Sequence, residues 1–435
     1  MDRVLDIGIL SGPAVIATWI LAAVALLLLI AIRPSRRWIR GRWMLTAAVA
    51  AVGFGVVGIA LTWLLADHYN LFGVVLTADS RMWIALAFAG IGIALASLWR
   101  ATWRRAIAAP LAIVLFALTG AMGVNIAFGQ YPTLRAALGL PAFGAADLPP
   151  VDPGDADRPT IDDWTPPAGM PAQGTVGTVT IPATASGFAA RPAVVYTPPA
   201  ALTDNPPLLP VLIIMSGQPG SPEDPLTAAH LQQSLDAYAA AHDGLAPFVV
   251  SPDQLGSPDA NPMCIDSALG NSATYLTVDV PNWIRANLPV LDAPGGWGIG
   301  GLSQGGTCSI QLGAAHPELF SAILDASGEE FPSLGDEATT IARGFAGDQA
   351  AYEAAKPAAI MAAHAPYQDM IAVFGVGSDD AGFLPGVQRI YQEAQAAGMT
   401  ASYVEAQGSA HDATAWSYIF QQGLETIADH WGLGR

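Results

Sequence analysis

Four long apolar runs occupy the first 128 residues and constrain the fold more than any other feature of the sequence. They cover residues 13–32, 44–66, 82–99 and 106–128. Each has about the twenty residues that an α-helix needs to cross the hydrocarbon core of a bilayer. The first run lies too deep, and is too closely followed by the others, to be a cleaved signal peptide. We therefore expect residues 1–128 to form an all-α transmembrane domain of four helices.

The connections between these runs differ in charge, and the difference predicts an orientation. The first connection holds Arg33, Arg36, Arg37, Arg40 and Arg42, and the third holds Arg100, Arg104 and Arg105. The second, residues 67–81, holds two aspartates and one arginine. Because cytoplasmic connections carry the excess of arginine, the first and third connections are predicted to be cytoplasmic. This orientation predicts a multi-pass protein of the cytoplasmic membrane with both termini outside the cytoplasm.

The two parts of the chain also differ in overall charge. Residues 1–128 have ten arginines and four acidic residues, a net charge of about +6, whereas the rest has eight basic and 32 acidic residues, about −24. So acidic a domain argues against nucleic acid as a partner. The four apolar runs contain no ionisable residue, which favours an anchor, or a platform for protein partners, over a transporter.

The rest of the chain, residues 129–435, is predicted to form a linker followed by an α/β domain. Residues 129–175 are rich in Pro, Gly and Asp and predict a linker. In residues 176–435 short apolar runs alternate with helical patterns. The strands are expected at 192–197, 211–215, 248–250, 297–300, 322–327, 370–377 and 401–406, and the helices at 226–241, 277–288, 304–315, 387–397 and 413–430. This alternation predicts a mainly parallel sheet with helices on both faces, and active groups in loops at the carboxyl ends of its strands.

A glycine-rich stretch, GIGGLSQGGTC at residues 298–308, follows one of these strands. A dinucleotide-binding fingerprint requires G-x-G-x-x-G, and here Ser303 stands at the third glycine. The pattern G-x-S-x-G is complete, from Gly301 to Gly305, between a predicted strand and a predicted helix. This context favours a nucleophile elbow that presents Ser303, in preference to a purely structural turn.

A serine nucleophile needs a base and an acid that orients the base, in the chain order serine, acid, histidine. Among the downstream histidines His316, His364, His411 and His430, only His411 lies in a loop between a predicted strand and a helix. For the acid, GVGSDDAGF offers Asp379 and Asp380 at the end of a strand. We favour Asp380, with Asp379 as the alternative.

The tetrahedral intermediate of acyl chemistry also needs hydrogen-bond donors for its oxyanion. We expect one to be the backbone N–H of Gln304, and the second the backbone N–H of Gln218 in the loop SGQPGSP after a predicted strand.

The two cysteines, Cys264 and Cys308, both belong to the acidic part. Two free buried thiols are one interpretation, but an oxidising compartment favours a disulfide. No zinc spacing, H-E-x-x-H motif or phosphate-binding loop is present, so we expect neither metal nor cofactor.

The chain resembles bacterial α/β-hydrolase esterases of the esterase D and antigen 85 (mycolyltransferase) type. The resemblance covers about residues 175–432, through MCIDSALGNSATYLTVDVPNWI, GGLSQGGTCSIQLGAAHPELFSAILDASGE, GFAGDQAAYEAAKP, GVGSDD and GSAHDATAW. It implies an α/β-hydrolase fold with a triad at Ser303, Asp380 and His411. Ser216 stands where many relatives have histidine, Ala346 replaces a glycine, and mycolyltransferases use Glu as the acid. These departures argue against mycolyl transfer but not against acyl chemistry.

Taken together, these features predict a membrane-anchored serine esterase or acyltransferase that acts on lipid or cell-envelope acyl esters outside the cytoplasmic membrane. The sequence leaves open whether water or an alcohol accepts the acyl group. The alternative is a catalytically silent hydrolase domain that organises the envelope or binds a partner.

Overall fold

The computed structural model describes residues 2–32, 39–69, 76–99, 101–149 and 158–434. The chain divides into two compact units, Met1–Pro141 and Ala142–Arg435. Arg33, Arg36, Arg37 and Arg100, on which part of the predicted orientation depends, lie outside the described residues.

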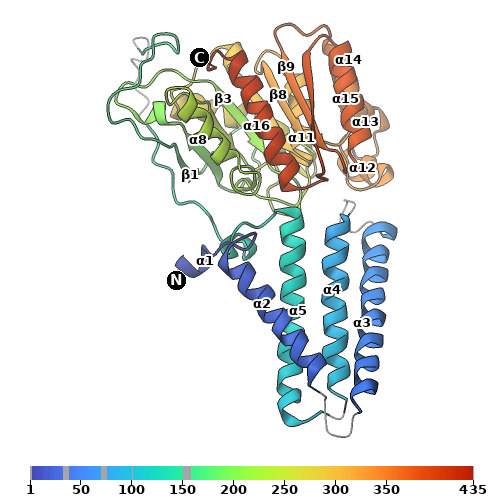
Figure 1. Ribbon diagram of the computed structural model, residues 1–435. Coiled ribbons are helices and arrows are strands. Elements are labelled where there is room, and N and C mark those ends of the chain that lie inside the picture. The colour runs from blue at the N-terminus through green and yellow to red at the C-terminus, as the bar shows by residue number, and fades with distance from the viewer. Residues whose placement is uncertain (1, 33–38, 70–75, 100, 150–157, 435) are drawn as a thin grey trace. The chain divides into compact units, whose positions relative to one another are not determined.

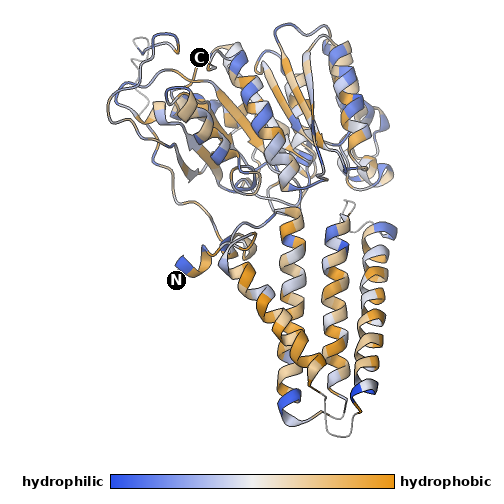
Figure 2. Cartoon of the chain, in the orientation of Figure 1, coloured by the Kyte–Doolittle hydropathy of each residue, from blue (hydrophilic) through white to orange (hydrophobic). Residues whose placement is uncertain are grey.

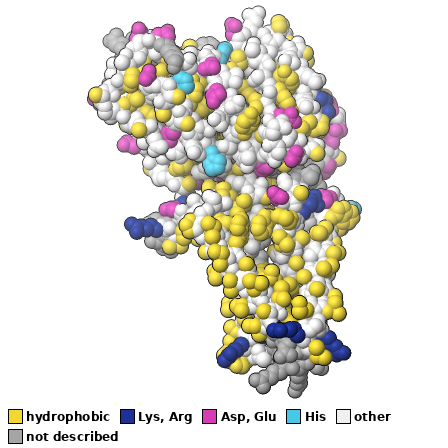
Figure 3. Space-filling view, in the orientation of Figure 1, with side chains coloured by type: hydrophobic (Ala, Val, Ile, Leu, Met, Phe, Trp, Pro, Cys, Tyr) yellow, Lys and Arg dark blue, Asp and Glu magenta, His cyan; other side chains and the backbone are white. Residues whose placement is uncertain are grey.

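The first unit is a bundle of four long helices, α2 (Pro13–Ala31), α3 (Arg40–Thr62), α4 (Ala78–Ser97) and α5 (Trp103–Phe128). A π-helical segment, η1 (Trp63–His68), extends α3, and two single turns, α1 (Asp2–Leu5) and α6 (Leu134–Ala137), flank the bundle. All four long helices are long and apolar enough to cross a membrane, which confirms the expectation. Most of their residues are hydrophobic (Figure 2), and many large hydrophobic side chains are exposed on the face of the bundle that Figure 3 shows.

Described residues at each end of this bundle make defined contacts. Around α1 and α6, Gly8 pairs with Thr133, so the start and the finish of the unit lie at the same end. At the other end, where α3 and α5 begin, basic side chains gather in Figure 3. There Arg105 is buried and donates hydrogen bonds to the carbonyl oxygens of Leu29 (2.9 Å) and Ile32, which lie at the C-terminus of α2. A cation at a helix C-terminus compensates unpaired carbonyl groups.

The second unit contains an eight-stranded sheet in the order β1-β2-β4-β3-β7-β8-β9-β10. The strands are β1 (Thr175–Val179), β2 (Ala193–Thr197), β3 (Val211–Met215), β4 (Phe248–Ser251), β7 (Trp297–Leu302), β8 (Ala322–Ala326), β9 (Ile371–Gly377) and β10 (Thr400–Ala406). Only the pairs β1–β2 and β2–β4 are antiparallel, so the expected mainly parallel sheet is confirmed. β5 (Asp266–Ser267) and β6 (Gly270–Asn271) form a separate small hairpin.

Helices cover both faces of the sheet (Figure 1). The larger ones are α8 (Leu231–Ala241), α10 (Val280–Asn287), α11 (Gln304–Ala315), α15 (Leu384–Ala396) and α16 (Ala413–His430). Gly313 of α11 lies against Ile323, and Gly423 of α16 lies against Leu324. Because neighbouring residues of a strand point to opposite faces, α11 and α16 lie on opposite sides of β8.

The structure departs from the expected elements in several regions. β1 and the hairpin of β5 and β6 were not among the expected strands. Three helices that the sequence patterns did not predict, α12 (Glu337–Gly344), α13 (Gln349–Ala354) and α14 (Pro357–His364), lie between β8 and β9. In the segment expected to be a linker, Phe143, Leu148, Ile161 and Trp164 pack against the core of the second unit. These side chains are too widely spaced, among Pro and Gly, to produce a periodic pattern.

Candidate active site

Ser303 lies in the turn between β7 and α11, where the backbone is strained. Its φ and ψ are 53° and −120°, a conformation that L-residues rarely adopt. A Cβ at Gly301 would lie 2.2 Å from the backbone of Gly305, and a Cβ at Gly305 would lie 2.5 Å from the carbonyl oxygen of Ser216. Both glycines of the G-x-S-x-G pattern are therefore sterically required, as expected for a nucleophile elbow.

His411 lies in the loop between β10 and α16, and its Nε2 atom is 2.8 Å from Ser303 Oγ. The side chain is only 6 % exposed. The next residue, Asp412, caps α16 by accepting a hydrogen bond from Ala415 N (3.0 Å), and it also accepts one from Ser409 Oγ (2.5 Å). This cap fixes the loop, and with it the position of the imidazole.

Asp380 follows β9, and its Oδ2 atom is 2.8 Å from His411 Nδ1. The carboxylate is 4 % exposed and also accepts a hydrogen bond from Phe383 N (3.3 Å). Asp379, the alternative acid, is exposed, and its carboxylate accepts a hydrogen bond from Ser378 Oγ (3.2 Å). The structure thus brings Ser303, His411 and Asp380 together in one hydrogen-bonded row and leaves Asp379 outside it.

The other downstream histidines lie elsewhere. His316 pairs with Glu318 (2.9 Å), His364 contacts the carbonyl oxygen of Ile360 (3.0 Å), and His430 ends α16.

Two aromatic side chains that sequence reasoning missed hold the imidazole of His411. The Phe383 ring stacks on it at 3.9 Å between centroids, and the Trp416 ring meets it edge-on at 5.3 Å. Both residues stand within motifs already noted, GVGSDDAGF and GSAHDATAW, but a motif does not show which aromatic residues pack together.

The loop after β3 passes directly beside Ser303. A Cβ at Gly217 would lie 3.3 Å from the Cβ of Ser303. Gln218 follows in this loop, and its side-chain Nε2 donates to the carbonyl oxygen of Asp259 (3.0 Å). Gln304 is the first residue of α11, so its backbone N–H is one of the four at a helix start that have no partner within the helix. Both expected oxyanion donors therefore belong to segments that adjoin Ser303.

Cys264 and Cys308 form a disulfide, which confirms the prediction. The bond links α11, one turn after Gln304, to the loop that follows β4. Gln304 Nε2 lies 3.2 Å from Cys308 Sγ. The disulfide thus supports the segment that begins directly after Ser303.

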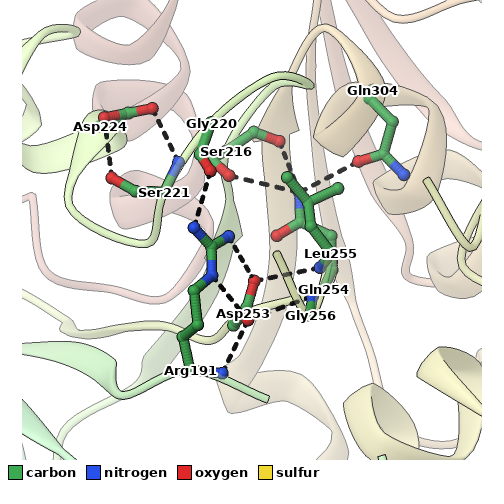
Figure 4. Close-up of polar contacts among 10 residues, drawn as sticks. All are labelled: Arg191, Ser216, Gly220, Ser221, Asp224, Asp253, Gln254, Leu255, Gly256 and Gln304. Atoms are coloured by element: carbon green, nitrogen blue, oxygen red, sulfur yellow. Dashed lines mark hydrogen bonds and ion pairs between the residues drawn. The ribbon is translucent and has the colours of Figure 1, made fainter. Parts of the chain in front are cut away.

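The residues after β4 also hold the segments next to Ser303 in place, which the sequence did not reveal (Figure 4). Gln254 Nε2 donates hydrogen bonds to the carbonyl oxygen of Ser216 (2.7 Å) and to Gln304 Oε1 (3.0 Å). Its neighbour Asp253 forms an ion pair with Arg191 (2.7 Å). Neither residue belongs to a recognisable motif, because the contacts depend on where three separate loops meet.

Asp325 is a buried acid on β8, the strand beside β7. Burial raises the pKa of its carboxyl to about 7, although the hydrogen bond from Gly328 N (2.8 Å) acts in the opposite direction. Among the described residues, no cluster of three or more His, Cys, Asp or Glu side chains has the arrangement of a metal site.

A cavity of about 300 Å³ lies at the opposite edge of the sheet, where β3 and β7 begin. Its lining includes Leu208, Leu291 and Trp431, and none of Ser303, Asp380 and His411. This cavity is therefore separate from the candidate active site.

Comparison with known proteins shows the family to which this chain belongs. The family model described as "Putative esterase" matches residues 191–427. An uncharacterized protein of Corynebacterium glutamicum is 33 % identical over 365 residues, covering 82 % of this chain and 84 % of the relative. That alignment is longer than residues 142–435, so it includes part of the N-terminal unit.

Similarity to solved structures covers about three fifths of this chain. A ferulic acid esterase matches with a TM-score of 0.50 and 18 % identity, over 61 % of this chain and all of the other. An S-formylglutathione hydrolase from Agrobacterium tumefaciens matches with a TM-score of 0.49 and 16 % identity, over 60 % of this chain and 96 % of the other. The first of these likenesses supports the α/β-hydrolase fold, and the family match and the relative together show that this chain belongs to the esterase family.

Proposed function

We propose that the protein is a membrane-anchored serine esterase or acyltransferase whose catalytic triad is Ser303, His411 and Asp380. The observation that carries the proposal is the pair of 2.8 Å contacts that join these side chains, on a serine held at φ 53°. An elbow serine hydrogen-bonded to a buried histidine, which is hydrogen-bonded in turn to a buried acid, provides the elements that acyl chemistry requires.

In the first half-reaction His411 Nε2 takes the proton of Ser303 Oγ while Oγ attacks the ester carbonyl carbon. The backbone N–H groups of Gln304 and Gln218 donate to the oxyanion that forms. Asp380 accepts from His411 Nδ1–H, which keeps the ring in the correct tautomer and stabilises the imidazolium. The intermediate then collapses, the leaving alcohol takes the proton from Nε2, and Ser303 remains acylated.

In the second half-reaction an acceptor hydroxyl loses its proton to His411 Nε2 while its oxygen attacks the acyl carbon. The bond from that carbon to Ser303 Oγ then breaks, and Oγ takes the proton back from Nε2. Water as acceptor gives a free acid, and an alcohol gives a new ester. Both outcomes use the same residues, so the acceptor that reaches Ser303 decides between hydrolysis and transfer.

We place the catalytic unit, essentially residues 176–435, outside the cytoplasmic membrane. Two features support this location: the basic side chains at the end of the bundle where α3 and α5 begin, and the Cys264–Cys308 disulfide, which suits an oxidising compartment. An enzyme anchored at that surface meets lipid and cell-envelope acyl esters first. We therefore propose these as its substrates.

The test is fluorophosphonate labelling of the full-length protein in detergent, wild type against Ser303→Ala, followed by turnover of a short-chain ester with and without glycerol or a sugar. Labelling at Ser303 with free acid as the product identifies an esterase. An acylated acceptor identifies a transferase. A wild-type protein that is folded but does not label would favour a catalytically silent domain.

A further inference from the structure

Gln254 connects the two segments that adjoin Ser303. It lies three residues after β4 and is completely buried. Its single amide nitrogen donates both to the carbonyl oxygen of Ser216 (2.7 Å) and to Gln304 Oε1 (3.0 Å), as Figure 4 shows. Ser216 begins the loop that contains Gln218, and Gln304 directly follows Ser303. One side chain thus contacts the segments that carry both oxyanion donors.

We propose that Gln254 is a positioning residue that sets the separation of the Gln218 and Gln304 backbone N–H groups around the ester oxygen. The inference rests on the proposed function, since it assigns a role in the same reaction. Donors stabilise an oxyanion most when they are fixed before the charge develops. A tie between the two donor segments is a direct way to fix them.

The loop after β3 is also held at its far end, so Gln254 acts on a segment that has little other freedom. Arg191 Nη1 donates to the carbonyl oxygen of Gly220 (3.0 Å). Asp253, which is fully buried, holds the same guanidinium through Nη2 (2.7 Å) and Nε (2.9 Å). The adjacent residues 253 and 254 therefore hold the two ends of the stretch from Ser216 to Gly220.

The bond to Gln304 has a fixed direction as well. Gln304 Nε2 donates to Asn261 Oδ1 (3.2 Å), and Asn261 Nδ2 donates to the carbonyl oxygen of Ser333 (2.9 Å). Because each amide nitrogen in this row faces an oxygen, the Gln304 side chain cannot turn over without losing both partners. Gln254 Nε2 therefore meets an acceptor whose position is already defined.

The experiment replaces Gln254 with Met, which keeps the length of the side chain and removes the amide. Full-length protein in detergent is used, and fluorophosphonate titration counts the competent sites. We expect kcat per titrated site to fall about tenfold or more, because small misplacements of catalytic donors are costly, while KM changes less than threefold. The second-order rate constant of phosphonate labelling should fall in parallel.

Gln311→Met is the matched control. Gln311 is buried on α11, and its Nε2 donates to the carbonyl oxygen of Ala355 (3.2 Å), which belongs to neither donor segment. In both glutamines Oε1 is buried without a hydrogen-bond partner among the described residues, so the two substitutions disturb the fold in a similar way. We expect Gln311→Met to keep the wild-type kcat per site.

Gln304→Met removes the same bond from its other end and serves if Gln254→Met yields no titratable protein. The double variant should lose less activity than the product of the two single losses, because both changes break the bond between Gln254 and Gln304. The proposal is overturned if kcat per site in Gln254→Met, or in Gln304→Met where that variant serves, stays within twofold of Gln311→Met. If instead the wild type does not label at Ser303, the proposed function itself fails.

Discussion

His411 Nδ1 lies 2.8 Å from Asp380 Oδ2, and both side chains are almost completely buried. The adjacent aspartate, Asp379, is exposed, and its carboxylate bonds to Ser378 Oγ. Two consecutive residues of the same type therefore occupy very different environments. The difference arises because the chain turns after β9 and points successive side chains in different directions.

This contrast provides a matched pair of substitutions. Asp380→Asn should lower kcat by roughly 10³- to 10⁴-fold, because an amide favours the wrong tautomer of His411. Asp379→Asn makes the same chemical change one residue away and should leave kcat within about twofold. Steady-state kinetics on a short-chain ester measures both. The opposite ranking would make Asp379 the acid and contradict the observed hydrogen bond.

Replacing the nucleophile is the most direct test of the triad. Ser303→Ala should reduce ester turnover by at least about 10³-fold and abolish fluorophosphonate labelling, while the circular dichroism spectrum stays unchanged. Ser309→Ala is a suitable control, since Ser309 lies on α11, the helix that begins directly after Ser303, and its hydroxyl donates to the backbone oxygens of Gly306 and Leu324. Undiminished turnover in Ser303→Ala would exclude Ser303 as the nucleophile.

Much of the site was predictable because each of its main parts has a local signature. A tight turn requires Gly301 and Gly305, the end of β9 presents two acids, and the loop before α16 contains a histidine. Each signature lies within a few residues, and the parallel sheet brings the strand ends to one edge. Seven of the eight strands of the sheet followed the same logic, since short apolar runs between helical patterns leave few alternatives, whereas β1 was not expected.

The parts that could not be predicted depend on contacts between distant segments. Gln254 touches Ser216 and Gln304 only because three loops converge, and Phe383 is placed over His411 by the turn after Asp380. The helices α12, α13 and α14 have only six to eight residues each and few large apolar side chains. Helical segments this short are difficult to distinguish from loops in a sequence.

The disulfide should contribute measurably to stability. The cysteines are 44 residues apart, and closing a loop of that length is typically worth about 3–4 kcal/mol. The melting temperature of the wild type should therefore fall after reduction in mild denaturant. The double variant Cys264→Ala with Cys308→Ala should melt lower from the start and not respond to reductant. Identical wild-type melting with and without reductant would contradict a stabilising bond.

Asp325 should make the stability of the second unit depend on pH. Its pKa is about 7 in the folded protein and near 3.9 when unfolded, so between these values only the folded chain keeps the proton. The free energy of unfolding should therefore fall as pH rises from about 4 to about 7, by up to roughly 4 kcal/mol. Asp325→Asn keeps an acceptor for Gly328 N and does not titrate. Melting curves at pH 5 and pH 8 should show a larger loss for the wild type than for this variant, and parallel losses would contradict the assignment.

The orientation of the membrane unit can be tested with two epitope tags. Because arginine-rich connections are retained in the cytoplasm, a tag between α2 and α3 should resist protease added to cells whose outer envelope has been permeabilised. A tag at the C-terminus, on the catalytic unit, should be removed under the same conditions. Detergent, which opens the membrane, serves as the control and should expose both tags. Protection of the C-terminal tag with loss of the internal one would place the catalytic unit in the cytoplasm, where a structural disulfide is rare. That outcome would direct the search for substrates to cytoplasmic esters.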